Sequence, residues 1–532
     1  MRRNYLSGFL LMVGLVVSAF SSPLKAYDVF GLCAGFTRHW WRGSKLDSVI
    51  MLTENLGIRW SREDFLWESI EVDSALYNMD LLAKYDTLLN KTLAHGINIY
   101  GILTASESQT CWSTGDNDPS TTKHFRDFAN FCTFVVDYFK GKIKYWEIWN
   151  EPDCPEFWKP QPDVQSYIQM LKYVYPAIKQ VDSSLVVLAP AYGGGDPEFL
   201  FEIFRNNGLN YMDILSMHAY SYDEPGSQTT FEISSVYSII DTFRDSMEYY
   251  GEVKPVWITE TGVPTHKGPH GSSRDRQATV LTRMIMLLIA KKIGHIDWYD
   301  LIDDGNDSTD REQNFGLVSC NLTPKIAYTA LEDLVRLLDG ATYIQEEDIG
   351  YENKALIFKT ADKKDLLALW TFEEVYENDT FAYAVPESVT MYLKNPPDSV
   401  FDIFGQTITY NFIRDTIHIT LNDKPVFVKG DFGYTTSSED YWLNQGISVE
   451  LPNPRIYFSG TVLTVLYELG LMSHISIQLY DIHGRQLNTL VDKQQYRGKY
   501  YVRWNSRLSP GLYIVTVESN YHRTATKTLF VR

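Results

Sequence analysis

Residues 146–153 read Trp-Glu-Ile-Trp-Asn-Glu-Pro-Asp, an apolar, strand-like run that ends in a polar turn carrying Glu151. A second segment, residues 257–262, reads Trp-Ile-Thr-Glu-Thr-Gly and places Glu260 at the end of another such run. Carboxylates at the carboxyl ends of parallel strands are typical of a (β/α)8 barrel, whose active site lies at that end. The two segments therefore predict a barrel with Glu151 and Glu260 at its mouth.

Strand-like and helix-like segments alternate from about residue 27 to residue 339. Eight alternations over this length predict a (β/α)8 TIM barrel, an α/β fold. A doubly wound sheet is the alternative, but no GxGxxG motif opens a helix after the first strand. We expect the strands at 29–34, 58–62, 97–103, 145–149, 185–189, 214–218, 256–260 and 296–301, with helices at 81–95, 122–139, 164–181, 234–250 and 274–292.

The pattern after residue 339 consists of short strand-like runs separated by turn residues, which predicts β structure. We expect a small β-sandwich at 340–430 and a polar linker at 431–448. A C-terminal, immunoglobulin-like all-β domain is expected at 449–532. The predicted strands of the sandwich are 355–359, 366–370, 389–393, 401–404, 408–410, 417–421 and 426–429.

The N-terminus has the features of a secretory signal peptide, which we place at 1–26. Arg2 and Arg3 precede an apolar run from 6 to 20, and small residues follow that run. The run is too short to favour a membrane span. The barrel domain is then 27–339, and the protein is expected to be exported.

Charge and composition narrow the class of ligand. The chain has 532 residues, more than one simple domain needs, and a formal net charge of -19. This charge argues against nucleic acid and against an anionic membrane surface, so a neutral substrate fits best. Aromatic residues make up 14% of the chain, which suits both core packing and stacking against sugar rings.

Five cysteines are too few and too widely spaced to predict a zinc site or a disulfide framework. One bridge, between Cys111 and Cys154, is the pairing we expect if any forms.

Glu151 and Glu260 together have the chemistry of a glycoside hydrolase. A single glutamate at a strand end is usually a surface residue, but two at the mouth of one barrel can flank a glycosidic bond. A retaining enzyme needs the carboxyl groups about 5 Å apart. One stays ionised as nucleophile, and the other has a raised pKa and acts as acid and base. Two carboxylates suffice for this reaction, so no cofactor or catalytic metal is expected.

The motifs around these glutamates resemble glycoside hydrolase clan A, whose members are retaining barrel enzymes. Asn150-Glu151-Pro152 matches the segment after strand 4 of that clan, and residues 258–262 match the end of strand 7. The resemblance implies Glu151 as acid/base and Glu260 as nucleophile. It also implies that Asn150 hydrogen-bonds the 2-hydroxyl of the sugar.

Other strand ends also match this clan. Arg62 fits the arginine beside the nucleophile, where its charge would keep Glu260 ionised. His218 and Tyr220 point the same way in a strand, and the resemblance implies that the tyrosine bonds the nucleophile and the histidine lines the subsite. Trp298 matches the sugar platform of the clan. Trp40 and Trp41 could flank a subsite, while Asp300, Asp303 and Asp304 suit a solvated loop, sugar hydroxyls or calcium.

Within the clan, the segment from 150 to 158 followed by Tyr167 is similar to family 39 and to related family 5 members. Many family 5 enzymes carry a histidine just after strand 3. This chain reads Leu103-Thr104-Ala105-Ser106 there, which argues against family 5.

The last module resembles the C-terminal sorting domain of type nine secretion in Bacteroidetes-like bacteria. The matching segments are 452–454, 479–485, 510–513 and 527–532. The resemblance implies an outer-membrane secretion machinery as partner and release at, or anchoring to, the cell surface. An immunoglobulin-like spacer or a sugar-binding module is the alternative.

Two functions are compatible with these features. The first is a secreted retaining glycoside hydrolase that cleaves β-glycosidic bonds of a polysaccharide or oligosaccharide, with β-xylosidase, β-glucanase and β-mannanase activities open. The second is a non-catalytic carbohydrate-binding surface protein that kept the barrel. Loops 106–122, with Trp112, and 264–273 are expected to decide endo or exo action.

Overall fold

The computed structural model describes residues 26–39, 45–105, 122–220, 231–268, 270–350, 352–372, 374–377 and 380–434, and, between 455 and 530, the strands β21 to β27 with a few adjoining residues. The chain forms two compact units. The first contains most of the residues up to Thr436, and the second contains Ser437–Arg532 with Ser238–Asp245. The predicted signal segment 1–26, except Ala26, and most of the predicted linker 431–448 lie outside the described residues.

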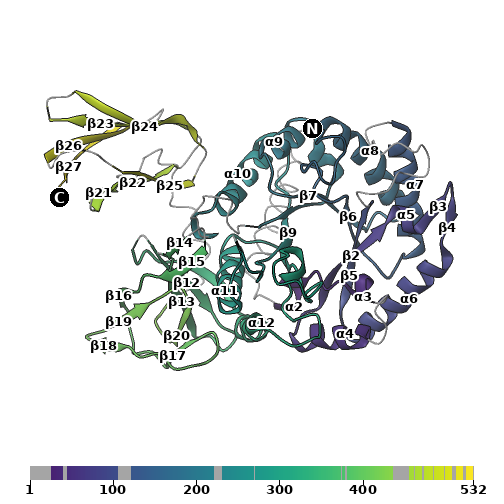
Figure 1. Cartoon of the computed structure of the whole chain (residues 1–532), viewed down its shortest axis with the longest axis horizontal. Coiled ribbons are helices and arrows are strands. Elements are labelled where there is room, and N and C mark those ends of the chain that lie inside the picture. The colour runs from purple at the N-terminus through teal and green to yellow at the C-terminus, as the bar shows by residue number, and fades with distance from the viewer. Residues whose placement is uncertain are drawn as a thin grey trace, which may run out of the picture. The chain divides into compact units, whose positions relative to one another are not determined.

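Eight parallel strands close into a barrel, in which each strand pairs with its neighbours in sequence (Figure 1). Every one of the eight predicted strands is present, so the predicted (β/α)8 barrel is confirmed. The strands are β1 (Phe30–Leu32), β2 (Trp60–Leu66), β5 (Asn98–Thr104), β6 (Tyr145–Ile148), β7 (Val186–Tyr192), β8 (Ile214–His218), β9 (Val256–Thr261) and β10 (His295–Trp298).

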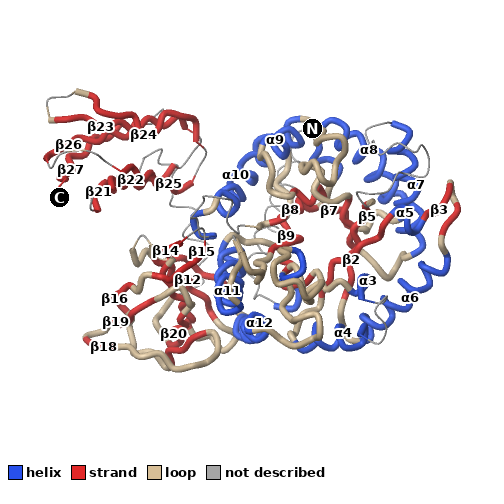
Figure 2. The backbone as a smooth tube through the Cα atoms, viewed as in Figure 1, coloured by secondary structure: helices blue, strands red, loops and turns tan. Residues whose placement is uncertain are grey.

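A helix follows each barrel strand, and Figure 2 shows the blue helices arranged around the red strands. Polar caps fix several helix starts, because Asn78, Asp163, Ser234 and Ser273 each accept a backbone N–H from the first turn. The helices are α4 (Lys45–Asn55), α6 (Met79–Ala94), α7 (Thr122–Tyr138), α8 (Val164–Val181), α9 (Glu198–Arg205), α10 (Ser235–Tyr250), α11 (Arg274–Ala290) and α12 (Ile326–Leu338).

Shorter elements lie between these strands and helices. They are α2 (Ala26–Val29), α3 (Phe36–His39), α5 (Trp67–Ile70), the hairpin of β3 (Glu71–Asp73) and β4 (Leu76–Tyr77), and the 3-10 turns η2 (Gly208–Tyr211), η3 (Phe231–Ile233) and η4 (Glu312–Asn314).

The barrel interior changes from aromatic to polar toward its carboxyl end. Near the amino ends of the strands, the rings of Trp60, Tyr145, Trp257 and His295 pack together, with centroids 4.5 Å apart for Trp257 and His295. Apolar side chains usually fill such layers of a barrel. Polar side chains in the layer nearer the carboxyl ends of the strands therefore indicate a functional site. The residues two positions further along the same strands are Arg62, Glu147, Thr259 and Asp297.

Two antiparallel sheets follow the barrel within the first unit and share one hydrophobic core, which includes Ile357, Leu367, Val389 and Ile417. This arrangement agrees with the sheets expected at 340–430. One sheet has the order β11 (Thr342–Glu346), β12 (Asn353–Lys359), β13 (Asp365–Thr371), β20 (Val426–Gly430) and β17 (Ser399–Asp402); the other has β16 (Glu387–Tyr392), β19 (Thr416–Leu421) and β18 (Asn411–Ile413).

Three details differ from the predicted strands, and the first is that β11 (Thr342–Glu346) was not predicted. The run 408–410 is not a strand, and β18 begins just after it. The hairpin of β14 (Glu374–Glu377) and β15 (Thr380–Ala384) was not predicted either.

The second unit also contains antiparallel sheets, with a core that includes Val465, Ile477 and Val515. Its strands support the expected all-β structure. They are β21 (Arg455–Ser459), β22 (Val462–Leu469) and β25 (Gly498–Asn505) in one sheet, and β24 (Gln486–Gln495), β23 (Ser473–Asp481), β26 (Gly511–Glu518) and β27 (Arg523–Phe530) in the other.

The cysteines of the described residues carry free thiols, and Cys154 is one of them. Cys154 therefore does not form the disulfide expected with Cys111. Cys111 itself lies outside the described residues. Within the described part of the chain, every helix is too short or too polar to cross a membrane.

Candidate active site

Glu151 and Glu260 lie together at the carboxyl end of the barrel, as the sequence predicted. Glu260 belongs to β9, and Glu151 lies just beyond the end of β6. One carboxylate oxygen of each, and a ring nitrogen of His218, all lie within 4.8 Å of one another. Inverting glycosidases hold their carboxyl groups about 6.5–9.5 Å apart and retaining ones about 5–5.5 Å apart. The spacing here is that of the retaining class.

The loop after β6 holds Glu151 through an unusual backbone path. Trp149 has φ of 68° and Glu151 has φ of 43°, a left-handed conformation that costs a non-glycine residue about 1–3 kcal/mol. Surrounding bonds enforce this path: the Glu151 N–H donates to the Ala191 carbonyl at 3.1 Å, and the Trp149 indole donates to the Phe157 carbonyl at 3.0 Å. The carboxylate is thus aimed by a rigid turn.

The loop after β7 packs directly against Glu151. A Cβ at Gly193 would lie 2.8 Å from the Glu151 Cδ and 2.9 Å from the Cys154 Sγ, so only glycine fits there. Asp153 fixes this loop by accepting the backbone N–H groups of Gly193 at 2.8 Å and Gly195 at 2.9 Å. The sequence analysis did not predict a role for Asp153, although it follows the Asn-Glu-Pro motif directly.

Glu260 is held by three side chains, and its own side chain is only 12% exposed. Arg62 pairs with Oε1, while the Tyr220 hydroxyl donates to Oε2 at 2.6 Å. His218 Nδ1 lies 3.6 Å from the same Oε2. Burial alone would raise the pKa of Glu260, but the charges of His218 and Arg62 and the hydrogen bond from Tyr220 bring it below its usual value. The predicted positions of Arg62 and Tyr220 beside Glu260 are therefore present.

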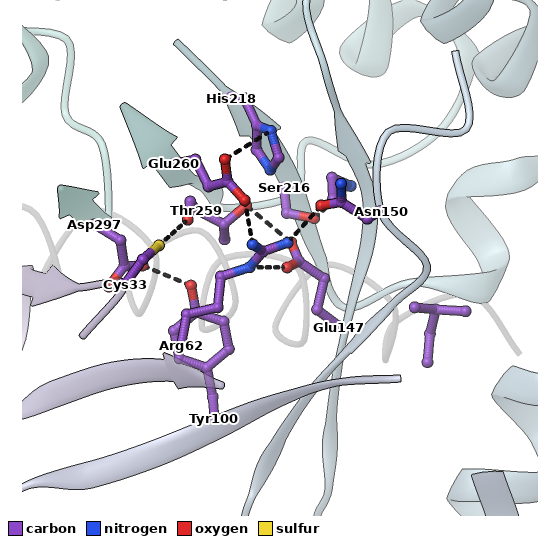
Figure 3. Close-up of polar contacts among 12 residues, drawn as sticks. Cys33, Arg62, Tyr100, Glu147, Asn150, Ser216, His218, Thr259, Glu260 and Asp297 are labelled. Atoms are coloured by element: carbon purple, nitrogen blue, oxygen red, sulfur yellow. Dashed lines mark hydrogen bonds and ion pairs between the residues drawn. The ribbon is translucent and has the colours of Figure 1, made fainter. Parts of the chain in front are cut away.

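Arg62 distributes its guanidinium among three acceptors, as Figure 3 shows. Nε donates to Glu147 Oε2 at 2.6 Å, Nη1 pairs with Glu260, and Nη2 donates to Asn150 Oδ1 at 2.9 Å. Because Asn150 accepts through Oδ1, its Nδ2 amide is the side suited to a substrate hydroxyl. This arrangement is compatible with the predicted role of Asn150.

Glu147 is a site residue that the sequence analysis missed. Its side chain is fully buried in β6, and it accepts a second hydrogen bond, from Thr259 Oγ1 at 2.9 Å. The available signal was a charged residue inside the apolar run 146–149, because glutamate is almost never fully buried without a partner.

Glu151 has the opposite electrostatic environment from Glu260. His218 Nδ1 lies 2.6 Å from its Oε1, and the Glu151 side chain is 15% exposed. Burial raises the pKa of Glu151; His218 lowers it in part, and the negative charges of Glu260 and Asp153 raise it further, so the net shift is upward. Burial lowers the pKa of His218, but Glu260 and Glu151 outweigh that effect and raise it. The surroundings thus shift the two pKa values in opposite directions, as expected of an acid/base and a nucleophile.

We expect a bell-shaped pH dependence of kcat/KM, because activity would require ionised Glu260 and protonated Glu151. The acidic limb should lie below the usual glutamate pKa of about 4.3 and the basic limb above it, with both limbs belonging to the coupled pair. Tyr220→Phe removes a hydrogen bond that lowers the pKa of Glu260, so the acidic limb should move to higher pH. Initial rates against pH for both proteins test this; an acidic limb unmoved in the variant would contradict it.

Trp298 does not have the position predicted for it. It is only 1% exposed, so its ring has no face available to a sugar. The next residue, Tyr299, is half-buried, and its ring contacts those of Tyr220 and Phe315 at centroid distances of 6.4 and 5.4 Å. Asp297 points into the barrel, and alternation along the strand places Tyr299 on the same side. Tyr299 is therefore the aromatic residue of this strand end nearest the site.

The acidic residues after β10 pair with cations of the protein. Arg38 Nη1 lies 3.1 Å from Asp304 Oδ2 and 3.8 Å from Asp300 Oδ2, and Lys325 Nζ lies 2.7 Å from Asp303 Oδ1. These pairs leave the three aspartates poorly suited to calcium. Trp40, Trp41 and Trp112 lie outside the described residues.

The donor atoms of Glu151, His218 and Glu260 are close enough together to hold a metal ion. The positive charge of Arg62 on Glu260 opposes a cation at this position. The hydrogen bond between His218 and Glu151 and the 3.6 Å contact between His218 and Glu260 account for their spacing without one.

Comparisons with known proteins place this geometry in context. A model of the family described as glycosyl hydrolases family 39 matches residues 30–404. The β-xylosidase of Geobacillus stearothermophilus is 26% identical over 230 residues, which cover 39% of this chain and 45% of that protein. The β-xylosidase of Caldicellulosiruptor saccharolyticus is 27% identical over 229 residues, covering 40% of this chain and 46% of that protein. The match thus spans about half the length of these curated relatives.

Two solved structures share the fold at low sequence identity. A family 39 glycoside hydrolase from the gut symbiont Bacteroides cellulosilyticus WH2 has a TM-score of 0.60 at 20% identity, with 77% of this chain and 81% of that chain covered. A monomeric β-xylosidase from Caulobacter crescentus CB15 has a TM-score of 0.52 at 15% identity, with 77% and 97% covered.

Proposed function

Because the chain belongs to glycosyl hydrolase family 39, we propose that it hydrolyses β-glycosidic bonds by double displacement, with Glu260 as nucleophile and Glu151 as acid/base. The observation that carries this proposal is the pair itself. Two carboxyl groups have oxygens within 4.8 Å of each other at the barrel mouth, and their surroundings shift the two pKa values in opposite directions. This spacing and these opposite pKa shifts support the proposal, because a retaining enzyme needs an acid/base and a nucleophile that lie close together.

In the first step, a Glu260 oxygen attacks the anomeric carbon while Glu151 gives its proton to the glycosidic oxygen. The bond between the anomeric carbon and that oxygen breaks, and the alcohol leaves with the Glu151 proton. A covalent ester between the sugar and Glu260 remains, with inverted configuration at the anomeric carbon. Tyr220 and Arg62, which hold the two Glu260 oxygens, orient the carboxylate for this attack.

In the second step, Glu151, now ionised, takes a proton from water as the water attacks the anomeric carbon. The bond to Glu260 breaks, and the second inversion restores the original configuration. His218, at 2.6 Å from Glu151 Oε1, stabilises the ionised form of that carboxylate between the two steps.

The substrate we propose is a β-xyloside or a related β-linked oligosaccharide or polysaccharide. The curated relatives that match this chain are β-xylosidases. A β-glucanase or β-mannanase activity remains an outcome of the test below.

We also propose that the protein is exported by its N-terminal signal segment and that its second unit is an immunoglobulin-like sorting domain for type nine secretion. Export is supported by the two arginines and the apolar run within residues 2–20. The sorting domain is supported by the motifs named above in the last 84 residues, a length typical of a small domain, and by the antiparallel sheets of the second unit. The sheets at 342–430 are proposed as a β-sandwich attached to the barrel.

The function is tested by assaying the full mature chain on a panel of aryl β-glycosides, with the xyloside first, and on matching β-linked polysaccharides. Proton NMR of early reaction mixtures identifies the anomer that is released first. We expect hydrolysis with the β-anomer first. Release of the α-anomer would contradict the retaining mechanism, and tight glycan binding without turnover on the whole panel would favour the non-catalytic binding protein instead.

A further inference from the structure

The guanidinium of Arg62 lies between two carboxylates, only one of which is the proposed nucleophile. Its Nε donates to Glu147 and its Nη1 pairs with Glu260. Arg62 is 6% exposed, Glu260 is 12% exposed and Glu147 is fully buried. One buried cation, Arg62, therefore pairs with two carboxylates. Holding Glu260 in position would require only one of these two pairs, so the pair with Glu147 needs its own explanation.

The geometry makes Glu147 the anchor of this group. A guanidinium is planar, and its donors point in fixed directions. Once Nε is bound to Glu147, the plane is set, and Nη1 and Nη2 point at Glu260 and Asn150. Glu147 is itself held at its other oxygen by Thr259, at 2.9 Å. The chain of contacts thus runs from Thr259 through Glu147 and Arg62 to the nucleophile.

The charges explain why the anchor is an acid. When Glu260 forms an ester with the sugar, it loses its negative charge, and Arg62 would be left as a buried cation without a counter-ion. Leaving one charge of a buried pair uncompensated is strongly unfavourable. Glu147 takes no part in either step, so Arg62 keeps this partner in the covalent intermediate. Glu147 also draws part of the Arg62 charge away from Glu260, which keeps that carboxylate more nucleophilic.

Other charged or titratable groups face this cluster from each neighbouring strand. None of those named here replaces Glu147, because they are either already engaged elsewhere or are weak acids whose pKa is raised by burial. They are Cys33, which directly follows β1, Tyr100 of β5, His218 of β8 and Asp297 of β10.

We propose, on the premise that the chain has the hydrolase function proposed above, that Glu147 is a positioning residue that orients Arg62 and balances its charge while Glu260 is consumed. Glu147 does not touch the sugar. Its effect reaches the reaction through the orientation of Arg62 and through the negative charge that Glu260 experiences.

Glu147→Gln is the variant that separates charge from shape. Glutamine keeps an oxygen that accepts from Arg62 Nε, and Thr259 can rotate to accept from the amide, but the negative charge is gone. The full charge of Arg62 then acts on Glu260, so the acidic limb of kcat/KM should move to lower pH by about one unit. We expect kcat/KM at the optimum to fall about 10- to 100-fold, the range typical for loss of a residue that orients the ligands of a catalytic metal.

Thr259→Val is the matched control. It keeps the charge of Glu147 and removes one hydrogen bond to it, so we expect a fall in kcat of roughly two- to tenfold with the acidic limb in place. A Glu147→Gln enzyme whose acidic limb and kcat/KM match those of the parent would overturn the proposal. If Glu147→Gln fails to fold, an unchanged kcat in Thr259→Val overturns it. An inactive parent would instead overturn the proposed function.

Discussion

Glu260→Ala is expected to reduce hydrolysis of aryl β-glycosides by a factor on the order of 10⁵ to 10⁶, the size of loss seen when a covalent nucleophile is removed. The variant cannot form the ester with the sugar. Water in the space left by the carboxylate is not aligned for attack on the anomeric carbon as well as the carboxylate was. Added azide should restore turnover, because the small anion fits that space. The product would be a glycosyl azide of inverted, α configuration, which NMR identifies.

Glu151→Ala gives the contrasting result that assigns the two roles. Substrates with good leaving groups need no proton, so they should still form the ester with Glu260, whereas poor leaving groups should react very slowly. Azide then attacks that ester, and the product keeps the β configuration. Glu198→Ala, at an exposed position on α9, is the control and should behave like the parent. The same azide anomer from both active-site variants would show that the roles are misassigned.

The barrel and the position of Glu151 and Glu260 together at its mouth were predictable because both depend on local sequence. Each strand is a short apolar run, and the position of a residue at the end of its strand follows from the same run. The matched family model confirms the resemblance to family 39 that the Asn-Glu-Pro segment indicated. Tyr220 was found by the same logic, since it lies just after β8 beside Glu260. Arg62 was expected at the end of its strand, but β2 continues to Leu66, and Arg62 reaches Glu260 from within the strand.

The parts that were missed depend on contacts between distant segments. Glu147 is 85 residues from Arg62 and 112 residues from Thr259, so its partners cannot be read from its own strand. The prediction that Trp298 is the sugar platform was wrong because the resemblance identified the platform by residue type and not by which side of the strand the ring faces. The alternation that follows from Asp297 points the neighbouring Tyr299 into the barrel instead, and a shift of one residue exchanges the two faces of a strand.

A second buried ion pair is expected to matter most for stability. Glu232 of η3 accepts from Arg283 of α11, with Nε at 2.6 Å and Nη2 at 2.7 Å, and from the Trp370 indole of β13 at 2.8 Å. Both charged side chains are almost completely buried. Burial opposes ionisation of Glu232, but the charge and hydrogen bonds of Arg283 prevail, and its pKa falls to about 2. Arg283→Met would leave that carboxylate buried and unpaired.

We expect Arg283→Met to lower the free energy of unfolding by about 3–5 kcal/mol, seen as a lower urea midpoint for the loss of activity. Trp370→Phe removes one hydrogen bond to the charged group and should cost about 1.5–3 kcal/mol. The double variant Glu232→Leu with Arg283→Met removes both charges, so it should be more stable than Arg283→Met alone. The reason is that the unpaired charge, rather than the lost attraction, accounts for most of the cost. A double variant less stable than Arg283→Met would contradict this account.

The pH dependence of the stability that this pair contributes follows from the direction in which folding shifts the pKa of Glu232. A carboxyl group whose pKa is lower in the folded state adds stability above its unfolded pKa, near 4.3 for an ordinary glutamate. That contribution is lost as the pH falls from there toward the folded value of about 2. The stability gap between the parent and Glu232→Leu/Arg283→Met should therefore shift in favour of the double variant below about pH 4. There the unfolded parent takes up a proton at Glu232, whereas the folded parent does not until the pH nears 2. Urea midpoints measured at pH 7, 4 and 3 for both proteins test this, and a gap constant across that range would show that folding does not lower the pKa of Glu232.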